Sequence, residues 1–258
     1  MAATAGALPE AGIPSAEILV EVNGLCKTYG PLAALEDVSF SVRRGEVFGL
    51  LGRNGSGKTT LLRILTTYRL PTAGSARIAG LDIVRDALSV RRRIGYMPEH
   101  PQLYRDLTVT GYLRLYATLQ GIPGRERDAR VREVVERFGL AAVEGRLVGH
   151  CSKGYRARIA LAAAVMHGPD VIFLDEPTDG LDPEQRARTH EEIRGLARTS
   201  AVVLSTHDLN EAASVCSRLL VLDRGRVVRV DTVEGFGGPQ GILEVFRQTR
   251  ERVTEQDL

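Results

Sequence analysis

The sequence has no long apolar run and almost no net charge, and each shortage excludes a class of protein. Nowhere do about 18 apolar residues follow one another, so we expect that the chain does not span a bilayer by itself and serves any membrane through a partner. The 34 basic and 32 acidic residues leave a net charge of +2, which provides no broad field for nucleic acid or an anionic membrane. Any anion must therefore be bound locally.

Cysteine is also scarce. Cys26, Cys151 and Cys216 lie far apart without the spacing of metal ligands, which favours reduced, small buried side chains in a cytoplasmic protein over a disulfide framework. The first residues are rich in Ala, Gly and Pro but carry no basic start, so residues 1–16 are predicted to be a disordered tail and not a signal peptide. The chain contains no internal repeat and no low-complexity tract.

Beyond this tail, short apolar runs alternate with helical patterns, which predicts an α/β fold. The predicted strands are 18–22, 38–42, 47–51, 76–78, 94–97, 171–174, 201–205 and 219–222. Helices are predicted from near Lys58 and over about 183–197 and 209–216. Between 110 and 138 the apolar spacing becomes helical, which indicates an inserted helical subdomain spanning about 98–165. In the extension 233–258, the glycine-rich segment 235–241 resembles a hinge before a charged terminal helix.

The strongest chemical signal is GRNGSGKTT, which follows an apolar strand and opens a helix, as a phosphate-binding loop requires. Its glycines let the backbone curl with the amides pointing inward, where a Cβ would block the approach of phosphates. Lys58 is expected to reach the β- and γ-phosphates and Thr59 to hold Mg²⁺. The predicted nucleotide-binding residues of this loop are Gly52, Arg53, Asn54, Gly55, Ser56, Gly57, Lys58, Thr59 and Thr60.

A second segment, VIFLDEPTDGLD, ends a buried strand with two carboxylates. Asp175 is placed to bind Mg²⁺ directly or through water, and Glu176 can polarise an attacking water. The alternative is that the two carboxylates cap the following turn. His207 follows the next buried strand and is a candidate contact of the γ-phosphate, although a lone histidine is more often structural.

The segment CSKGYRAR places a Ser-Lys-Gly turn before a helix of small apolar residues. Amides at a helix start have no intrahelical partner and carry partial positive charge, so this turn is suited to hold a phosphate. The residues themselves do not say whose phosphate it is.

Taken in this order, the motifs resemble those of the ATP-binding subunit of ABC transporters, over about residues 19–230. The resemblance implies that Tyr29 stacks on adenine, that Lys58, Glu176 and His207 are catalytic, and that Thr59, Asp175 and Glu99 contact the metal. It also assigns residues 151–155 to the family signature, with Arg158 at the position of the family's arginine. Further nucleotide contacts implied by it are Glu99, Ser152, Lys153, Gly154 and, in the D-loop, Asp182.

The family's fold is a P-loop NTPase with a RecA-like core, an antiparallel β subdomain and an inserted α-helical subdomain, here expected over 17–232. The resemblance implies ATP and Mg²⁺, and a head-to-tail dimer of this chain with itself or a paralogous subunit. It also implies a separate transmembrane permease that holds the dimer at the inner face of the plasma membrane. Because the signature helix then binds the γ-phosphate held by the other subunit, this implied dimer answers the question of whose phosphate is bound.

Two other classes of protein share part of this pattern. A small-molecule kinase or GTPase shares the phosphate loop but does not need the CSKGYRAR, D-loop and histidine set. The main alternative is a soluble ABC-family ATPase that acts on a ribosome or a nucleic-acid complex. The DNA-repair type normally has a long coiled-coil insertion and the translation type two ATPase domains in one chain, and neither is present here. Because the net charge is near zero, we also expect no nucleic-acid partner.

The sequence departs from the family pattern at two places. Lys153 and Tyr155 replace a Gly and the Gln of the signature, and Glu99 stands where a glutamine is usual. These departures resemble an exporter subgroup that includes the gliding-motility type. We hypothesise that Glu99 and Lys153 of the opposing subunit compensate each other's charge across the closed interface. The alternative is that Lys153 is solvated and Glu99 ligates a metal-bound water.

Overall fold

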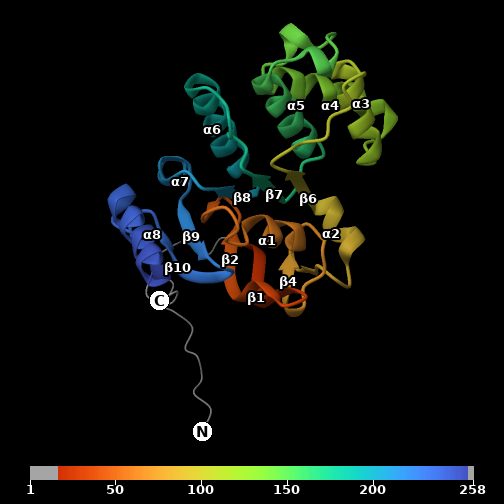
Figure 1. Cartoon of the computed structure of the whole chain (residues 1–258). Helices are drawn as coiled ribbons and strands as arrows, with labels where there is room; N and C mark the ends of the chain where they lie inside the picture. The colour runs from red at the N-terminus through yellow and green to blue at the C-terminus, as the bar shows by residue number, and fades with distance from the viewer. Residues whose placement is uncertain (1–16, 255–258) are drawn as a thin grey trace.

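The structure is a computed structural model that describes the backbone of residues 17–254 and the side chains as far as residue 247. The segment 1–16, predicted to be a disordered tail, lies outside the described residues. The described chain forms two sheets and a set of helices (Figure 1). The helices are α1 (Lys58–Leu65), α2 (Ala87–Arg93), α3 (Val109–Leu119), α4 (Gly124–Arg137), α5 (Lys153–Val165), α6 (Pro183–Ala197), α7 (Leu209–Val215) and α8 (Gly238–Thr254).

The smaller sheet is antiparallel, with strand order β2-β1-β4-β5. It contains β1 (Ile18–Tyr29), β2 (Leu32–Arg43), β4 (Ala73–Ile78) and β5 (Leu81–Asp82). The larger sheet has the order β10-β9-β3-β8-β7-β6, and only its edge strand β10 runs antiparallel to its neighbour. Its strands are β3 (Val47–Leu51), β6 (Ile94–Met97), β7 (Val171–Asp175), β8 (Ala201–Thr206), β9 (Arg218–Asp223) and β10 (Arg226–Thr232).

The central strands of the larger sheet are buried on both faces, as the continuous apolar runs predicted. In β7, Ile172 and Leu174 pack into the core on the side of α5 and α6, whereas Val171 and Phe173 pack into the core shared with the smaller sheet and α1. This alternation follows from the two-residue period of a strand. The larger sheet therefore separates two hydrophobic cores and holds its strand ends in a fixed row.

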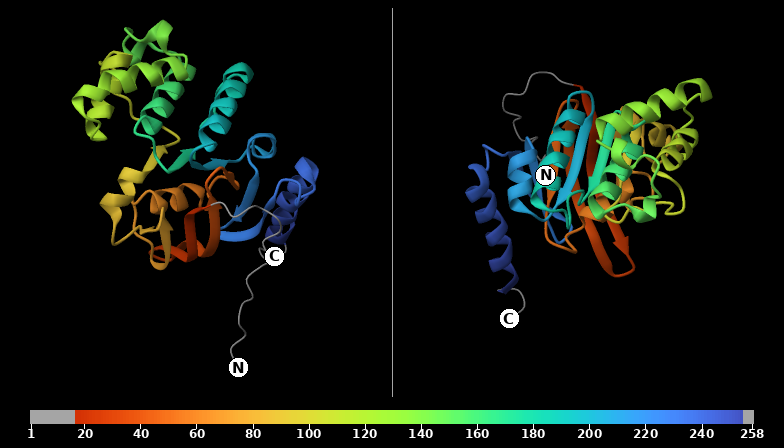
Figure 2. Two further views of the ribbon diagram at one scale, coloured as in Figure 1. Left: turned by 180° about the vertical axis from the view of Figure 1, so that it is seen from behind. Right: turned by 90° about the horizontal axis from the view of Figure 1, so that it is seen from above.

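The helices α3, α4 and α5 lie together beyond the β6 edge of the larger sheet (Figure 1). Figure 2 places α8 at the opposite end of the molecule. The fold is thus mixed α/β with an antiparallel β part and an inserted helical part, as expected from the sequence. None of the described helices is long and apolar enough to cross a membrane.

The cysteines agree with the sequence interpretation, since Cys26, Cys151 and Cys216 are all free thiols and the last two are buried. Burial raises the pKa of the Cys216 thiol well above its ordinary value. The predicted hinge at 235–241 needs correction. Helix α8 begins at Gly238, and both Phe236 before it and Ile242 within it are buried in the core. Because two apolar side chains anchor this segment, it docks on the domain.

Candidate nucleotide site

The predicted site residues gather where parallel strands of the larger sheet end, the usual position of a ligand in such a sheet. The loop after β3 begins at Gly52, β7 ends at Asp175 and β8 is followed by His207. A cleft of about 1010 Å³ opens along these ends. The predicted residues that line it are Tyr29, Arg53, Asn54, Gly55, Gly57, Lys58, Thr59, Thr60, Glu99, Glu176 and His207.

The loop from Gly52 is held in a tight curl that only glycine fits. Gly57 has a φ of +109°, and a Cβ there would lie 2.7 Å from the carbonyl oxygen of Ala34. Lys58 Nζ donates hydrogen bonds to the carbonyls of Gly52 at 2.7 Å and Arg53 at 3.3 Å, so its ammonium lies inside the curl. Gly55 has a positive φ of +81° with open space where a Cβ would stand. The loop therefore curls around one buried cation, which its own backbone carbonyls hold.

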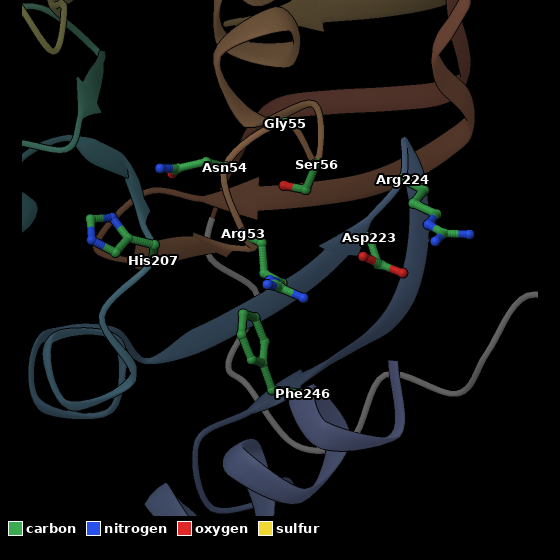
Figure 3. Close-up of a pocket in the computed structure, with 8 residues that line it drawn as sticks. All are labelled: Arg53, Asn54, Gly55, Ser56, His207, Asp223, Arg224 and Phe246. Atoms are coloured by element: carbon green, nitrogen blue, oxygen red, sulfur yellow. The ribbon is translucent and has the colours of Figure 1, made fainter. Parts of the chain in front are cut away.

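A smaller cavity of about 460 Å³ lies beside this loop, between the β9–β10 turn and α8. Figure 3 shows the Phe246 ring of α8 directed toward the Arg53 side chain of the loop. Ser56 lines the same cavity, and within the described part of the chain its buried Oγ has no hydrogen-bond partner. Helix α8 therefore lines one side of the cavity beside the phosphate loop.

Two of the three residues predicted to contact Mg²⁺, Thr59 and Asp175, lie together. Asp175 is buried and its Oδ1 accepts a hydrogen bond from Ser205 Oγ at 2.6 Å and one from Thr59 Oγ1 at 3.5 Å. A hydroxyl and a carboxylate at one spot fit Mg²⁺, which prefers oxygen ligands and keeps several waters and phosphate oxygens. Ser205 was not among the predicted residues. The sequence feature that could have indicated it is its position near the end of β8, two residues before His207.

Glu176 has an unusual backbone and close charged neighbours. Its φ is +49°, in the left-handed region that a glutamate rarely adopts. Its carboxylate lies 3.4 Å from Lys58 Nζ and 2.9 Å from His207 Nδ1. Burial raises the pKa of Glu176 above its ordinary value of 4.5, while Lys58 and His207 oppose the rise. The side chain thus points into the cleft as a largely buried carboxylate beside the loop lysine, and it does not cap the following turn.

Two predicted residues lie at the margins of the cleft. The Tyr29 ring is 41% exposed and the Lys27 ammonium lies 5.0 Å from its centroid, so one ring face is available at the rim. The Glu99 side chain is exposed, and Nε2 of His100 lies 3.9 Å from its Oε1. Asp179 and Arg224 also line the cleft, although the sequence argument did not single them out.

The start of α5 lies outside this cleft. Among the described residues that line it, none belongs to the segment 151–155. Ser152 caps α5 by accepting a hydrogen bond from the Tyr155 amide at 3.3 Å, and Gly154 packs so closely on the Gln185 side chain of α6 that a Cβ would clash with it. The turn predicted to hold a phosphate therefore does not face the phosphate loop of its own chain.

Lys153 and Asp182 have partners within the chain. Lys153 Nζ lies 3.7 Å from Asp179 Oδ2, and Glu99, Lys153 and Asp179 line a pocket of about 320 Å³. Asp182 caps α6 by accepting a hydrogen bond from the Gln185 amide at 2.9 Å. The pairing of Lys153 with Glu99 across two copies stays a prediction, as does the nucleotide contact of Asp182.

Comparison with known proteins agrees with this geometry. The family model described as ABC transporter matches residues 35–179, which is more than half of the chain. The daunorubicin resistance ATP-binding protein DrrA3 of Streptomyces coeruleorubidus is 41% identical over 227 residues, which cover 88% of this chain and 72% of the relative. This chain belongs to the ABC transporter family.

Two further relatives of this ABC chain refine the family assignment. The Nod factor export ATP-binding protein I of Ralstonia nicotianae is 39% identical over 85% of this chain and 68% of its own length. A solved structure, the dimeric bacterial ABC transporter cassette MJ0796, superposes with a TM-score of 0.76 at 27% identity, covering 83% of this chain and 99% of the cassette. The chain is thus an ATP-binding and ATP-hydrolysing subunit of an ABC transporter. The comparisons support this interpretation and not the ribosomal or nucleic-acid alternative.

Proposed function

We propose that the ABC chain binds ATP with Mg²⁺ in the cleft at the strand ends, and that two copies close head to tail to hydrolyse it. Tyr29 stacks on the adenine, the amides of Gly52–Thr60 and Lys58 hold the phosphates, and Glu176 accepts a proton from the attacking water. His207, bonded to the Glu176 carboxylate, orients that carboxylate and contacts the γ-phosphate. Each role is supported by the position of the side chain on the cleft.

Thr59 and Asp175 are the residues that would hold Mg²⁺. The bound ion would neutralise negative charge that develops on the phosphate oxygens. The hydrogen bond from Ser205 fixes the Asp175 carboxylate, while Thr59 already lies against its oxygen. For Glu99, whose side chain lies at the rim of the same cleft, we propose contact through a metal-bound water.

One observation carries the proposal of a dimer. The α5 tip that has the free amides of a phosphate site does not line the cleft of its own chain. A second copy can supply that tip, so ATP bridges two chains and favours the closed pair, and hydrolysis removes the bridge. The solved cassette MJ0796 is described as dimeric, which supports pairing of two copies.

The motion of this pair would drive a separate membrane permease, with the ATPase held at the inner face of the plasma membrane. We propose export as the direction, because the motifs resemble exporter ATPases and one relative is named for Nod factor export. The likeness to the gliding-motility subgroup supports the same direction. The surface near Glu99 and Leu103–Leu107, where Tyr104 is exposed, is the proposed contact with the permease.

The decisive experiment compares the wild-type chain with Glu176→Gln. Because a general base typically contributes 10²–10⁴ in rate, hydrolysis by the variant is expected to slow by about that factor while ATP binding is retained. With Mg²⁺ and ATP, the variant is expected to form a stable dimer of twice 28.1 kDa by light scattering. Without nucleotide it is expected to be monomeric.

A matched control adds Ser152→Arg to Glu176→Gln. Ser152 is exposed at the α5 tip and outside the cleft, so the control should still bind ATP but fail to dimerise. Co-purification of a permease from detergent-solubilised membranes tests the partner. A Glu176→Gln variant that binds ATP and stays monomeric, or a wild-type rate per chain unchanged on dilution far below any dimer, would rule out the proposed dimer.

A further inference from the structure

Helices α6 and α7 are joined along one seam by regularly spaced contacts. The α6 residues are four positions apart, and the partners on α7 and its N-cap are three positions apart, so each helix presents one face to the other. The contacts are Arg186 Nη1 to Asp208 Oδ2 at 3.0 Å, His190 Nε2 to Glu211 Oε1 at 3.1 Å, and Arg194 Nη2 to the Ser214 carbonyl at 3.0 Å. These contacts join α6, which follows the Glu176 loop, to α7, which follows His207.

The middle contact differs from the outer two because it is buried. Glu211 is 4% exposed, His190 8% and Thr178 4%, and Glu211 Oε1 accepts a hydrogen bond from Thr178 Oγ1 at 2.5 Å as well as the one from His190. Since an ionised carboxylate only accepts, the imidazole Nε2 carries the proton in this pair. Burial alone would raise the pKa of Glu211, but the hydrogen bonds from His190, Thr178 and Thr206 hold it below its ordinary value. The Glu211 carboxylate is therefore charged and accepts hydrogen bonds from these three side chains.

This cluster adjoins the strained part of the candidate site. Thr178 stands two residues after Glu176, whose left-handed backbone costs roughly 1–2 kcal/mol and persists only where its surroundings fix it. On one side, Ser205 fixes that backbone, because its carbonyl and Oγ accept from the Glu176 amide at 3.2 Å and 3.1 Å. On the other side, Thr178 is held by Glu211.

The contacts form a closed ring. His207 Nδ1 bonds to the Glu176 carboxylate, Glu176 leads to Thr178 along the chain, Thr178 bonds to Glu211, and Glu211 leads back to His207 through the first turn of α7. We infer that Thr178, Glu211 and His190 form a clamp that positions the Glu176 carboxylate and the His207 ring for hydrolysis. None of the three lines the nucleotide cleft, so they are positioning residues. The inference rests on the proposed function.

The test replaces Thr178 by Val, which keeps the shape and removes the hydroxyl, and by Ser, which keeps the hydroxyl. A displacement of about 1 Å at a reacting group can cost 10²-fold, so kcat of Thr178→Val is expected to fall by about 10- to 10²-fold. The KM for ATP is expected to stay unchanged, because the cleft contacts remain. Thr178→Ser is expected to restore most of kcat.

A double variant separates positioning from general loss of structure. If the clamp acts through Glu176, adding Thr178→Val to Glu176→Gln should lower the residual rate no further, because effects of residues that act as a unit are not additive. The control Arg194→Met breaks an outer contact of the seam without touching Thr178, and its kcat should equal that of the wild type.

The outcomes distinguish this inference from the proposed function. The proposed function fails if the wild-type chain neither binds nor hydrolyses ATP. The clamp alone fails if the wild type is active and Thr178→Val has the same kcat. The clamp also fails if Thr178→Val changes kcat and KM together and Thr178→Ser does not restore them. It fails as well if Thr178→Val lowers the rate by the same factor in the wild type and in the Glu176→Gln variant.

Discussion

At the scale of single residues, the phosphate loop depends on one glycine for two separate reasons. Gly57 has a φ of +109°, and a Cβ would meet the Ala34 carbonyl at 2.7 Å and the Leu35 side chain at 2.9 Å. The left-handed region alone costs an L-residue roughly 1–2 kcal/mol, and the contact with backbone adds to it. We expect Gly57→Ala to weaken ATP binding by at least about tenfold, measured by titration calorimetry.

The matched control is Gly80→Ala, at a turn far from the cleft. Gly80 has a similar φ of +78° but open space around its Cβ position. This variant should lose about 1 kcal/mol of unfolding free energy and keep its ATP affinity. Equal ATP affinity in Gly57→Ala and the wild type would contradict the steric argument.

The residues of the cleft could be predicted because their signals are local. Gly52 and His207 directly follow buried strands and Asp175 ends one, and parallel strands bring their ends to one edge. The Thr178, Glu211 and His190 cluster could not be predicted in the same way. Its members lie 21 and 33 positions apart in hydrogen-bonded pairs, and each residue type is common in loops and helices. The four-residue spacing on α6 was the only signal available.

At the scale of secondary structure, α8 packs on the domain through apolar side chains that include Ile242, Val245 and Phe246. Phe246 packs partly against the core and lines the cavity beside the phosphate loop. Because truncation of a fully buried Phe costs 3–5 kcal/mol, the half-buried Phe246→Ala should cost about 1–2 kcal/mol of unfolding free energy. Chemical denaturation measures this loss, and Leu119→Ala, at a highly exposed position of α3, is the control with almost no expected change. A Phe246→Ala chain as stable as the control would mean that α8 is not anchored there.

Elements with strong periodic or apolar patterns were predicted well. The strand at 47–51, the strand at 94–97 and the helix at 183–197 have the predicted bounds. Helix α2 and strand β10 were not predicted, because α2 is short and ends in three arginines and β10 is an edge strand with mixed residues. The glycines of 235–241 suggested a hinge, but burial of Phe236 and Ile242 decides the conformation instead. Tertiary packing overrode local propensity there.

At the scale of the whole molecule, the unusual charges Glu99 and Lys153 can be tested for coupling. Direct compensation across two copies predicts that Glu99→Gln and Lys153→Gly each lower the ATPase rate more than both together, with coupling on the order of 0.5–3 kcal/mol. Additive effects of the two substitutions would dispose of the pairing. Asp179→Asn is the control within one chain, because Asp179 is the partner that Lys153 already has there.

The direction of the α5 tip also bears on cells that express two versions of this chain. Because the tip does not line its own cleft, an inactive copy could still occupy the place of a working one and offer it a faulty surface. Overproduction of such a copy should then depress transport in a cell with an intact gene. Dominance of this kind is a genetic signature of a catalytic centre shared between neighbours.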